Sequence, residues 1–306
     1  MYNPEANRQG HSITDEDTQL QINFIALQIF NGVTFGMLIF LLATGLTLTL
    51  GLMNVANLAH GSFYMLGGYI GFSVALYTGN FFLGLLASIF SIWIGGMLMY
   101  RGLLQQGFAK EELSQMLLCF GVILIVSDLC LWLWGGYPKF VVKPMLFKGS
   151  IHLGRIVLPT YRFVVIIVGA IIAVFLWWFQ GKTKYGAIIR AGVDDEEMAR
   201  GIGINITLVR LLVFSLGTAL AACAGFLGGP ILGLYPGIDV EVLLMAIVVI
   251  VIGGVGSLSG ALVGAIFIGL INSFGRSLFP EFAMFTIFAP MAIVLAIRPS
   301  GLFGEA

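Results

Sequence analysis

The feature that most constrains this chain is a long run without a charged side chain. After Asp17, no Asp, Glu, Lys or Arg occurs until Arg101. A membrane-spanning helix needs about 20 apolar residues, so the run has room for three spans. The whole chain is 59% hydrophobic and 10% charged, whereas a soluble domain carries about 25% charged residues. We therefore expect a polytopic membrane protein, and the 15 basic and 15 acidic side chains leave no excess for binding nucleic acid.

The apolar segments predict an all-α fold with eight or nine transmembrane helices. The spans are expected at about 22–51, 62–79, 80–100, 115–134, 160–180, 209–229, 240–253, 258–275 and 282–297. The 240–253 segment is short and runs into Gly253-Gly254-Val255-Gly256, so we predict a half-helix that breaks near 253–257. Backbone broken at membrane depth survives only where protein buries it or where it lines a cavity.

The polar segments divide the chain into one transmembrane domain and its appendages. Residues 1–21 predict a polar N-terminal tail rather than a signal peptide, 22–298 the membrane domain, and 299–306 a short C-terminal tail. Two loops lie on opposite sides: 135–159, whose β-prone pieces predict a hairpin outside the bilayer, and the charged loop 181–208. Lys and Arg divide eight against seven between the two sides, so the positive-inside rule leaves the orientation open.

The loop at 181–208 contains a pattern typical of a short capped helix. Its residues of interest are Asp194, Asp195, Glu196, Glu197, Met198, Arg200, Gly201 and Gly203. Asp194 is predicted as the N-cap with Glu197 as its capping-box partner, and Val193 can pack on Met198 as a hydrophobic staple. Arg200 falls in the last turn, before the two glycines that end the helix. So short a helix does not persist alone in water, so it is either a solvated connector or a surface that docks on a partner.

Glycine makes up 41 of the 306 residues, and much of it is spaced four apart. The positions that we expect in helix contacts are Gly217, Gly225, Gly256, Gly260 and Gly264. Small residues on one face let helix backbones approach closely where lipid removes the hydrophobic drive. Such faces also suit helices that rock during alternating access, and spacing alone does not separate packing from motion.

Polar residues gather within the charge-free run at Asn54, Asn57, His60, Ser62 and Tyr64. They either satisfy free backbone groups between two spans or line a substrate path in which a helix N-terminus attracts a carboxylate.

Four acids have a notable place in the predicted topology. Asp128 is the one acid deep inside a predicted span and is therefore a functional candidate. Asp239, Glu241 and Glu281 lie at span ends, where we expect them at the interface.

The sequence offers little for catalysis or for cofactors. It has no H-E-x-x-H pattern and no paired intramembrane carboxylates, and its three histidines are scattered over the predicted topology. Gly181-Lys182-Thr183 resembles the end of a phosphate-binding loop, but Leu176 stands where that loop needs a glycine. We expect neither an enzyme, a metal site nor an ATP site. An ion-coupled secondary carrier that uses Asp128 is an alternative class.

Three stretches occur in a set order along the chain: 57–69 (NLAHGSFYMLGGY), 190–205 (RAGVDDEEMARGIGIN) and 253–264 (GGVGSLSGALVG). A closing PSGLFG occupies 299–304. Together they resemble the membrane permeases of branched-chain amino acid ABC importers, the Liv family, over about 23–304. The chain departs from the family at 101–112, which lacks a proline often found there, and in the 135–159 loop.

The resemblance implies a permease subunit in a bacterial inner membrane that carries branched-chain or other hydrophobic amino acids, with urea or short-chain amides as alternative cargo. Its partners would be two cytoplasmic ATPase subunits that bind the ATP, a second homologous permease or a copy of itself, and a periplasmic solute-binding protein. The 181–208 loop would face the ATPases. The N-terminus and the 135–159 loop, with Lys139, Lys143 and Lys148, would face the periplasm, and the C-terminus the cytoplasm.

Overall fold

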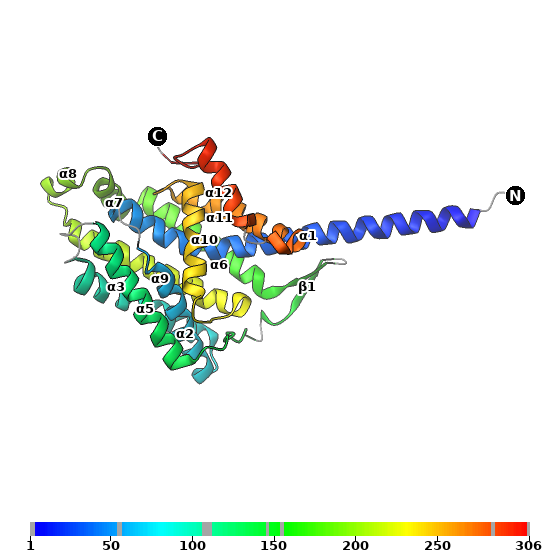
Figure 1. Cartoon of the computed structure of the whole chain (residues 1–306), viewed down its shortest axis with the longest axis horizontal. Helices are drawn as coiled ribbons and strands as arrows, with labels where there is room; N and C mark the ends of the chain where they lie inside the picture. The colour runs from blue at the N-terminus through cyan, green and yellow to red at the C-terminus, as the bar shows by residue number, and fades with distance from the viewer. Residues whose placement is uncertain are drawn as a thin grey trace.

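In the computed structural model, a helix lies at each of the nine segments predicted to span the membrane (Figure 1). The structure describes residues 4–53, 57–105, 112–144, 147–153, 156–282 and 285–304. The helices are α1 (Pro4–Met53), α2 (His60–Thr78), α3 (Phe81–Met99), η1 (Tyr100–Leu104), α5 (Glu112–Trp134), α6 (Thr160–Lys182), α7 (Lys184–Asp194), α8 (Glu196–Gly201), α9 (Ile206–Leu232), α10 (Ile238–Gly253), α11 (Leu258–Leu278), η3 (Pro280–Phe282) and α12 (Phe285–Ile297). Within these described ranges, six helices are long and apolar enough to cross a membrane: α1, α3 with η1, α5, α6, α9 and α11. The chain is an all-α polytopic membrane protein.

Three helices at predicted spans do not meet that measure. α10 has 16 residues and α12 has 13, about 24 and 20 Å of helix against a hydrocarbon core of about 30 Å. α2 has 19 residues but contains four glycines and begins at His60. Length and composition therefore support six spans in the described part of the chain, short of the eight or nine predicted.

The predicted break near 253–257 separates α10 from α11. Gly254 and Gly256 have φ of 102° and 81° there, a region that favours glycine. The C-terminal segment closes over the break, because the N–H of Leu302 donates to the Ile252 carbonyl at 2.8 Å and that of Phe303 to the Gly253 carbonyl at 3.0 Å. These bonds satisfy carbonyls that the end of α10 would otherwise leave free.

Helix α1 is longer than a bilayer requires. It has 50 residues, of which Gln19–Gly51 form the apolar span. The polar residues predicted as a tail, 1–21, therefore belong from Pro4 onward to this helix, which extends away from the other helices (Figure 1). Helix propagation adds one hydrogen bond per residue once a nucleus exists, and the apolar span supplies that nucleus.

The predicted hairpin in the 135–159 loop is confirmed. Strands β1 (Ser150–Leu153) and β2 (Ile156–Pro159) pair antiparallel, with Ile151 opposite Leu158. The preceding stretch of the loop is tied to the bundle through Lys139 and Leu234, which exchange two backbone hydrogen bonds of 2.8 Å. The loop is thereby fixed beside the C-terminal end of α9.

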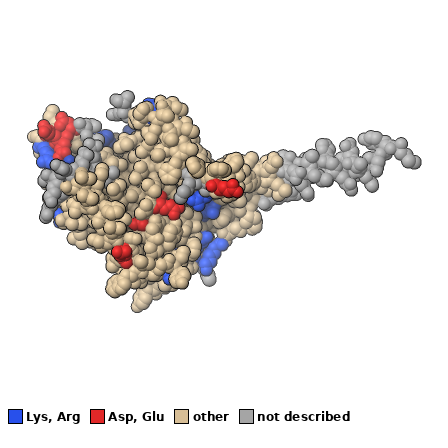
Figure 2. All heavy atoms as spheres, in the orientation of Figure 1, with Lys and Arg blue, Asp and Glu red and all other residues tan. Residues whose placement is uncertain are grey.

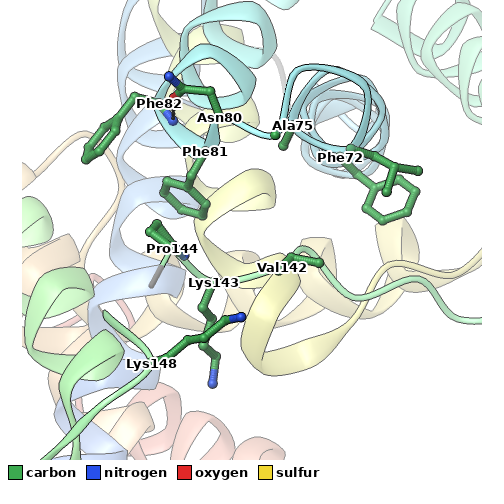
Figure 3. Close-up of a pocket in the computed structure, with 11 residues that line it drawn as sticks. Phe72, Ala75, Asn80, Phe81, Phe82, Val142, Lys143, Pro144 and Lys148 are labelled. Carbon is green, nitrogen blue, oxygen red and sulfur yellow. Dashed lines mark hydrogen bonds between the residues drawn. The ribbon is translucent and has the colours of Figure 1, made fainter. Parts of the chain in front are cut away.

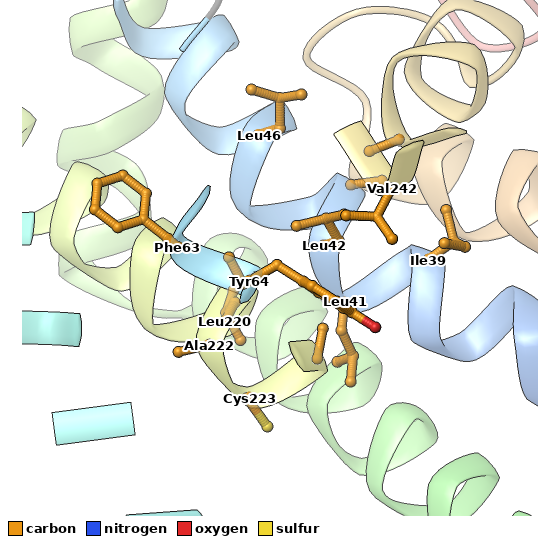
Figure 4. Close-up of a cluster of buried hydrophobic side chains, with 14 of the residues drawn as sticks. Ile39, Leu41, Leu42, Leu46, Phe63, Tyr64, Leu220, Ala222, Cys223 and Val242 are labelled. Atoms are coloured by element: carbon orange, nitrogen blue, oxygen red, sulfur yellow. The ribbon is translucent and has the colours of Figure 1, made fainter. Parts of the chain in front are cut away.

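Helices α1 and α9 form the centre of the bundle. Over the 18 most apolar residues of each span, 83% are buried in α1 and 89% in α9, against 17% in α5 and 17% in α6. Figure 4 shows the central contacts, with Leu42 of α1, Tyr64 of α2, Cys223 of α9 and Val242 of α10 in one cluster. Two helices from distant parts of the sequence thus carry the core, and α5 and α6 lie at its edge.

Candidate functional site

The charged loop folds into the short helices α7 and α8. The N-cap of α8 is Asp195, whose Oδ1 accepts a hydrogen bond from the N–H of Met198 at 2.9 Å. The prediction of Asp194 as the N-cap, with Glu197 as its capping-box partner, is therefore wrong by one residue. The reason is that α7 continues through Asp194, and the backbone becomes extended only at Asp195, with φ of −153°. The Val193 side chain of the predicted staple lies outside the described residues.

Ion pairs fasten α8 to the central helix α9. Glu196 accepts hydrogen bonds from Nε and Nη2 of Arg200, at 3.1 and 2.6 Å, and from Nη2 of Arg210 on α9, at 2.5 Å. Figure 2 shows acidic and basic side chains together at this end of the molecule, where α8 lies. The i,i+4 spacing of Glu196 and Arg200 could be read from the sequence, whereas the pairing with Arg210 depends on the fold.

The outer side of α8 is left uncovered. Met198 is 66% exposed and Ile202 is 70% exposed, while Ala199 is buried against the bundle. Glu197 is also exposed. Gly201 has open space around it, and Gly203 has φ of 91° where the helix ends. This end of the molecule therefore presents an apolar tip with adjacent acids on a helix that the chain itself holds in place.

The polar residues at the start of α2 are enclosed by the bundle. His60 has no exposed surface, and its Nε2 lies 3.1 Å from the Leu42 carbonyl of α1. Asn57 is buried, and its Oδ1 accepts from Sγ of Cys119 on α5 at 3.7 Å. Tyr64 is buried against α9. Asn54 lies outside the described residues.

Asp239 joins this cluster: it lies in the first turn of α10, at the end of a predicted span, and the bundle encloses it. It is 2% exposed, and its Oδ2 accepts a hydrogen bond from Ser62 at 3.2 Å. The reason is that Gly61 lets α2 approach the Asp239 carbonyl, so the first turn of the short helix α10 lies inside the bundle. A sequence signal was available in the length of α10, which is too short to reach both interfaces.

Several atoms of this cluster make no hydrogen bond to the described residues. They are Asn57 Nδ2, His60 Nδ1, Tyr64 OH and Asp239 Oδ1. Buried polar atoms in folded proteins almost always have a partner. These atoms, from α2, the residues just before it and α10, therefore keep hydrogen-bonding capacity for a polar solute or for water.

Four of the five glycines singled out in the sequence lie where helices touch. A Cβ atom at Gly217 would meet the Gly45 carbonyl, one at Gly225 that of Tyr64, one at Gly260 that of Gly253, and one at Gly264 that of Val249. Gly256 does not belong with them, because it lies in the turn before α11 with φ of 81°, and its nearest neighbour would be Gly51 at 3.9 Å. Its requirement for glycine is therefore conformational.

A pocket of about 500 Å³ lies at the end of the bundle opposite α8, between the α2–α3 turn and the loop that precedes β1 (Figure 3). Phe72, Phe81 and Phe82 line it together with Lys143 and Lys148. Lys143 Nζ lies 5.6 Å from the centre of the Tyr161 ring, within the range of a cation–π contact. Two of the three lysines noted in the loop thus share one cavity.

Asp128 lies apart from the buried cluster, on the exposed side of α5. In the part of the chain that the structure describes, no group of three or more His, Cys, Asp and Glu side chains could hold a metal ion.

Comparison with known proteins gives a consistent set of relatives. The family described as branched-chain amino acid transport system, permease component, matches residues 28–295. The chain is 28% identical to the high-affinity branched-chain amino acid transport system permease protein LivH of Escherichia coli, over 93% of this chain and 97% of that protein. It is 27% identical to BraD of Pseudomonas aeruginosa, over 91% and 95%. The probable permease LivH of Methanocaldococcus jannaschii is 27% identical, over 79% and 78%.

Proposed function

This chain belongs to the family of branched-chain amino acid transport permeases, and we propose that it is the membrane-spanning permease subunit of an ABC importer. It translocates branched-chain or other hydrophobic amino acids that a solute-binding protein delivers. It is a transport component rather than an enzyme, and the ATP that drives it binds to partner subunits. The names of the relatives specify branched-chain amino acids, which favours that cargo over urea or short-chain amides.

We propose a bacterial inner-membrane location with α8 and the C-terminus in the cytoplasm. The N-terminus and the loop with Lys139, Lys143 and Lys148 then face the periplasm, where the lysines meet acidic groups of the binding protein. α2, α10 and α12 complete nine membrane-embedded segments, with α10 as the half-helix. Two permease subunits, identical or homologous, enclose the path, and two ATPase subunits attach on the cytoplasmic side.

The observation that carries the proposal is the way in which α8 is joined to the centre of the bundle. Glu196 links α8 to Arg210, close to the start of α9. Helix α9 is 27 residues long in all, about 40 Å, and most of it is buried. Closure of an ATPase around Met198 and Glu197 would therefore move α9 as a rigid element rather than deform a loop.

The far part of α9 contacts the polar cluster that we assign to the substrate path. Gly225 touches the backbone of Tyr64, and Gly217 touches that of Gly45. The closest atoms at these two contacts are backbone atoms, and such close approaches of small residues suit helices that shift against one another. Asn57, His60, Ser62 and Tyr64, with Asn54 from the sequence, would then be enclosed in one state and face the path in another.

The test is an uptake assay with the full complex in proteoliposomes. Glu197→Lys with Met198→Asp changes the exposed face of α8 but keeps its cap and its ion pairs. We expect ATPase subunits to be lost on purification and vanadate-sensitive leucine uptake to fall at least about tenfold, because a docking side chain contributes about 2 kcal/mol or more. Glu281→Lys, an exposed acid on η3 at the other end of the molecule, is the matched control.

Unchanged ATPase binding and uptake in the α8 variant would refute the docking assignment.

The same assay examines the outer loop. Replacing the three lysines by Gln should lower the stimulation by the binding protein while ATPase assembly stays intact.

A further inference from the structure

A small cavity lies among helices at the end of the molecule opposite α8. Its volume is about 110 Å³, and its lining residues come from α1, α9, α10, α11 and the α9–α10 turn. They are Phe35, Leu232, Tyr235, Ile238, Glu241, Val242, Met245 and Arg276. It shares no lining residue with the larger pocket that Lys143 and Lys148 line, and is therefore distinct from it.

The cavity is lined by one carboxylate and one guanidinium, both on exposed side chains, and these two groups do not form an ion pair. Oε2 of Glu241 accepts a hydrogen bond from the Tyr235 hydroxyl at 2.6 Å, and Nε of Arg276 donates to Asn272 Oδ1 at 2.9 Å. Among the described residues the ion pairs are those of Glu196, so Glu241 and Arg276 line the same space without pairing. Each charge is therefore held by a neutral neighbour and keeps hydrogen-bonding capacity for a ligand.

The remaining wall is apolar and fixed. Ile238, Val242 and Met245 are all less than 9% exposed, and Phe35 and Leu232 complete the lining. Burying an aliphatic side chain against such a wall is favourable by about 25 cal/mol per Å². The cavity thus offers a cation, an anion and an apolar surface within one small volume.

The size of the cavity limits what can occupy it. At about 10–15 Å³ for each water-sized group, a volume of 110 Å³ holds roughly seven to eleven such groups. Free aliphatic amino acids fall in that range, and they carry an ammonium, a carboxylate and an apolar chain on one carbon. Urea and short amides have no charge to match Glu241 or Arg276.

The position of the cavity fits the reception of a solute. Leu232 ends α9, and α8 lies near the other end of that helix. Leu234, two residues further on, pairs with Lys139 of the basic loop. If that loop receives the binding protein, a released solute meets this cavity close by.

We propose that this cavity is a receiving site on the outer face for a zwitterionic aliphatic amino acid. Arg276 pairs with the carboxylate, Glu241 accepts from the ammonium, and the side chain lies against Phe35, Val242 and Met245. The inference rests on the proposed function, since it takes the end opposite α8 as the outside. The site binds weakly, because it must pass the solute on.

The first test measures thermal unfolding of the permease–ATPase complex without binding protein. Leucine at 10 mM should raise Tm by about 2–4 °C if its Kd is about 1 mM. 4-Methylpentanoate lacks the ammonium and 3-methylbutylamine lacks the carboxylate, so each should raise Tm by less than half as much. Equal shifts from all three compounds, or no shift from leucine, would overturn the proposal.

The second test compares leucine uptake among charge variants. Glu241→Gln and Arg276→Gln should each lower uptake about tenfold, which corresponds to about 1.4 kcal/mol, and should abolish the leucine-dependent Tm shift. Glu281→Gln and Arg298→Gln are matched controls, because both residues are exposed and lie outside the cavity. Copurified ATPase measures assembly, and where a variant assembles poorly the ligand series on the wild-type complex decides.

The outcomes separate the two proposals. A wild-type complex without ATP-dependent uptake would refute the transport function. A wild-type complex that transports normally, with cavity variants that match their controls in uptake and in Tm shift, would refute the receiving site alone.

Discussion

The centre and the edge of this bundle differ in burial, and the difference is the opposite of what mean hydropathy alone would predict. Over their 18 most apolar residues, α5 and α6 have the higher mean hydropathy, 2.5 each, yet only 17% of those residues are buried. The corresponding stretch of α9 has a mean hydropathy of 2.0, with 89% buried. In a soluble protein the most apolar helices would lie inside. Here the solvent is lipid, so apolar side chains cover the outside, while glycine, serine and threonine are enriched where helices meet.

Glycine shows the same contrast at the level of single residues. A Cβ at Gly225 of α9 would collide with the Tyr64 carbonyl, whereas one at Gly121 of α5 would meet nothing within 4 Å. Both glycines lie inside helices of similar length. The packing partner, rather than the residue type, therefore decides which glycine the fold requires.

The largest loss of stability is expected at the contact between α9 and α2 that Gly225 makes. Gly225→Ala places a methyl group against backbone, which cannot rotate away, so α2 must move from α9. We expect a loss of about 3 kcal/mol in the free energy of unfolding, the upper end of the usual range for overpacking. The measurement is SDS-induced unfolding of the purified subunit in detergent micelles.

Gly121→Ala on α5 is the matched control for that substitution. It should leave the free energy of unfolding within about 1 kcal/mol of wild type, because Ala also has the better helix propensity. Equal destabilisation at the two positions would mean that the centre and the edge do not differ as described.

Much of the fold follows from local sequence, because each span carries its own signal. The charge-free run, the hairpin at β1 and β2 and the break at Gly254 could all be predicted from composition and turn chemistry. The sequence places the cap of α8 one residue too early, at Asp194. Asp194 and Asp195 are both good capping residues, and the cap is Asp195 because α7 continues through Asp194.

The contacts between distant segments could not be predicted in the same way. The burial of Asp239 depends on Gly61 of α2, 178 positions away in the chain, and the cavity at Glu241 depends on Arg276 of α11. Neither pair has a fixed spacing that a sequence pattern could show. Residue types thus indicated the family, and the fold was needed to find the polar groups that meet.

A smaller effect should follow from removing one hydrogen bond of the buried cluster. Ser62→Ala leaves Asp239 Oδ2 without its donor inside the bundle, and we expect a loss of about 1–3 kcal/mol, the usual penalty for an unsatisfied buried group. Ser127→Ala on α5 is the same change at a half-buried position of the edge and should cost less than about 0.5 kcal/mol. Comparable losses at both positions in SDS-induced unfolding would argue that the Ser62–Asp239 contact contributes nothing to stability.

The smallest effect on uptake and on stability is expected for Asp128, the exposed acid on the edge helix α5. Asp128 is exposed on α5 whereas Asp239 is buried, and a permease driven by ATPases has no need of a titrating carboxylate. Asp128→Asn should therefore leave ATP-driven leucine uptake within about twofold of wild type, and stability should be equal or higher, because a carboxylate inside a membrane costs about 2.5–3.5 kcal/mol at the bilayer centre. Uptake is measured in proteoliposomes with and without ATP and with and without an imposed pH gradient. If wild-type uptake followed the pH gradient without ATP and was lost in Asp128→Asn, the chain would be an ion-coupled carrier and Asp128 of α5 would take part in its transport mechanism.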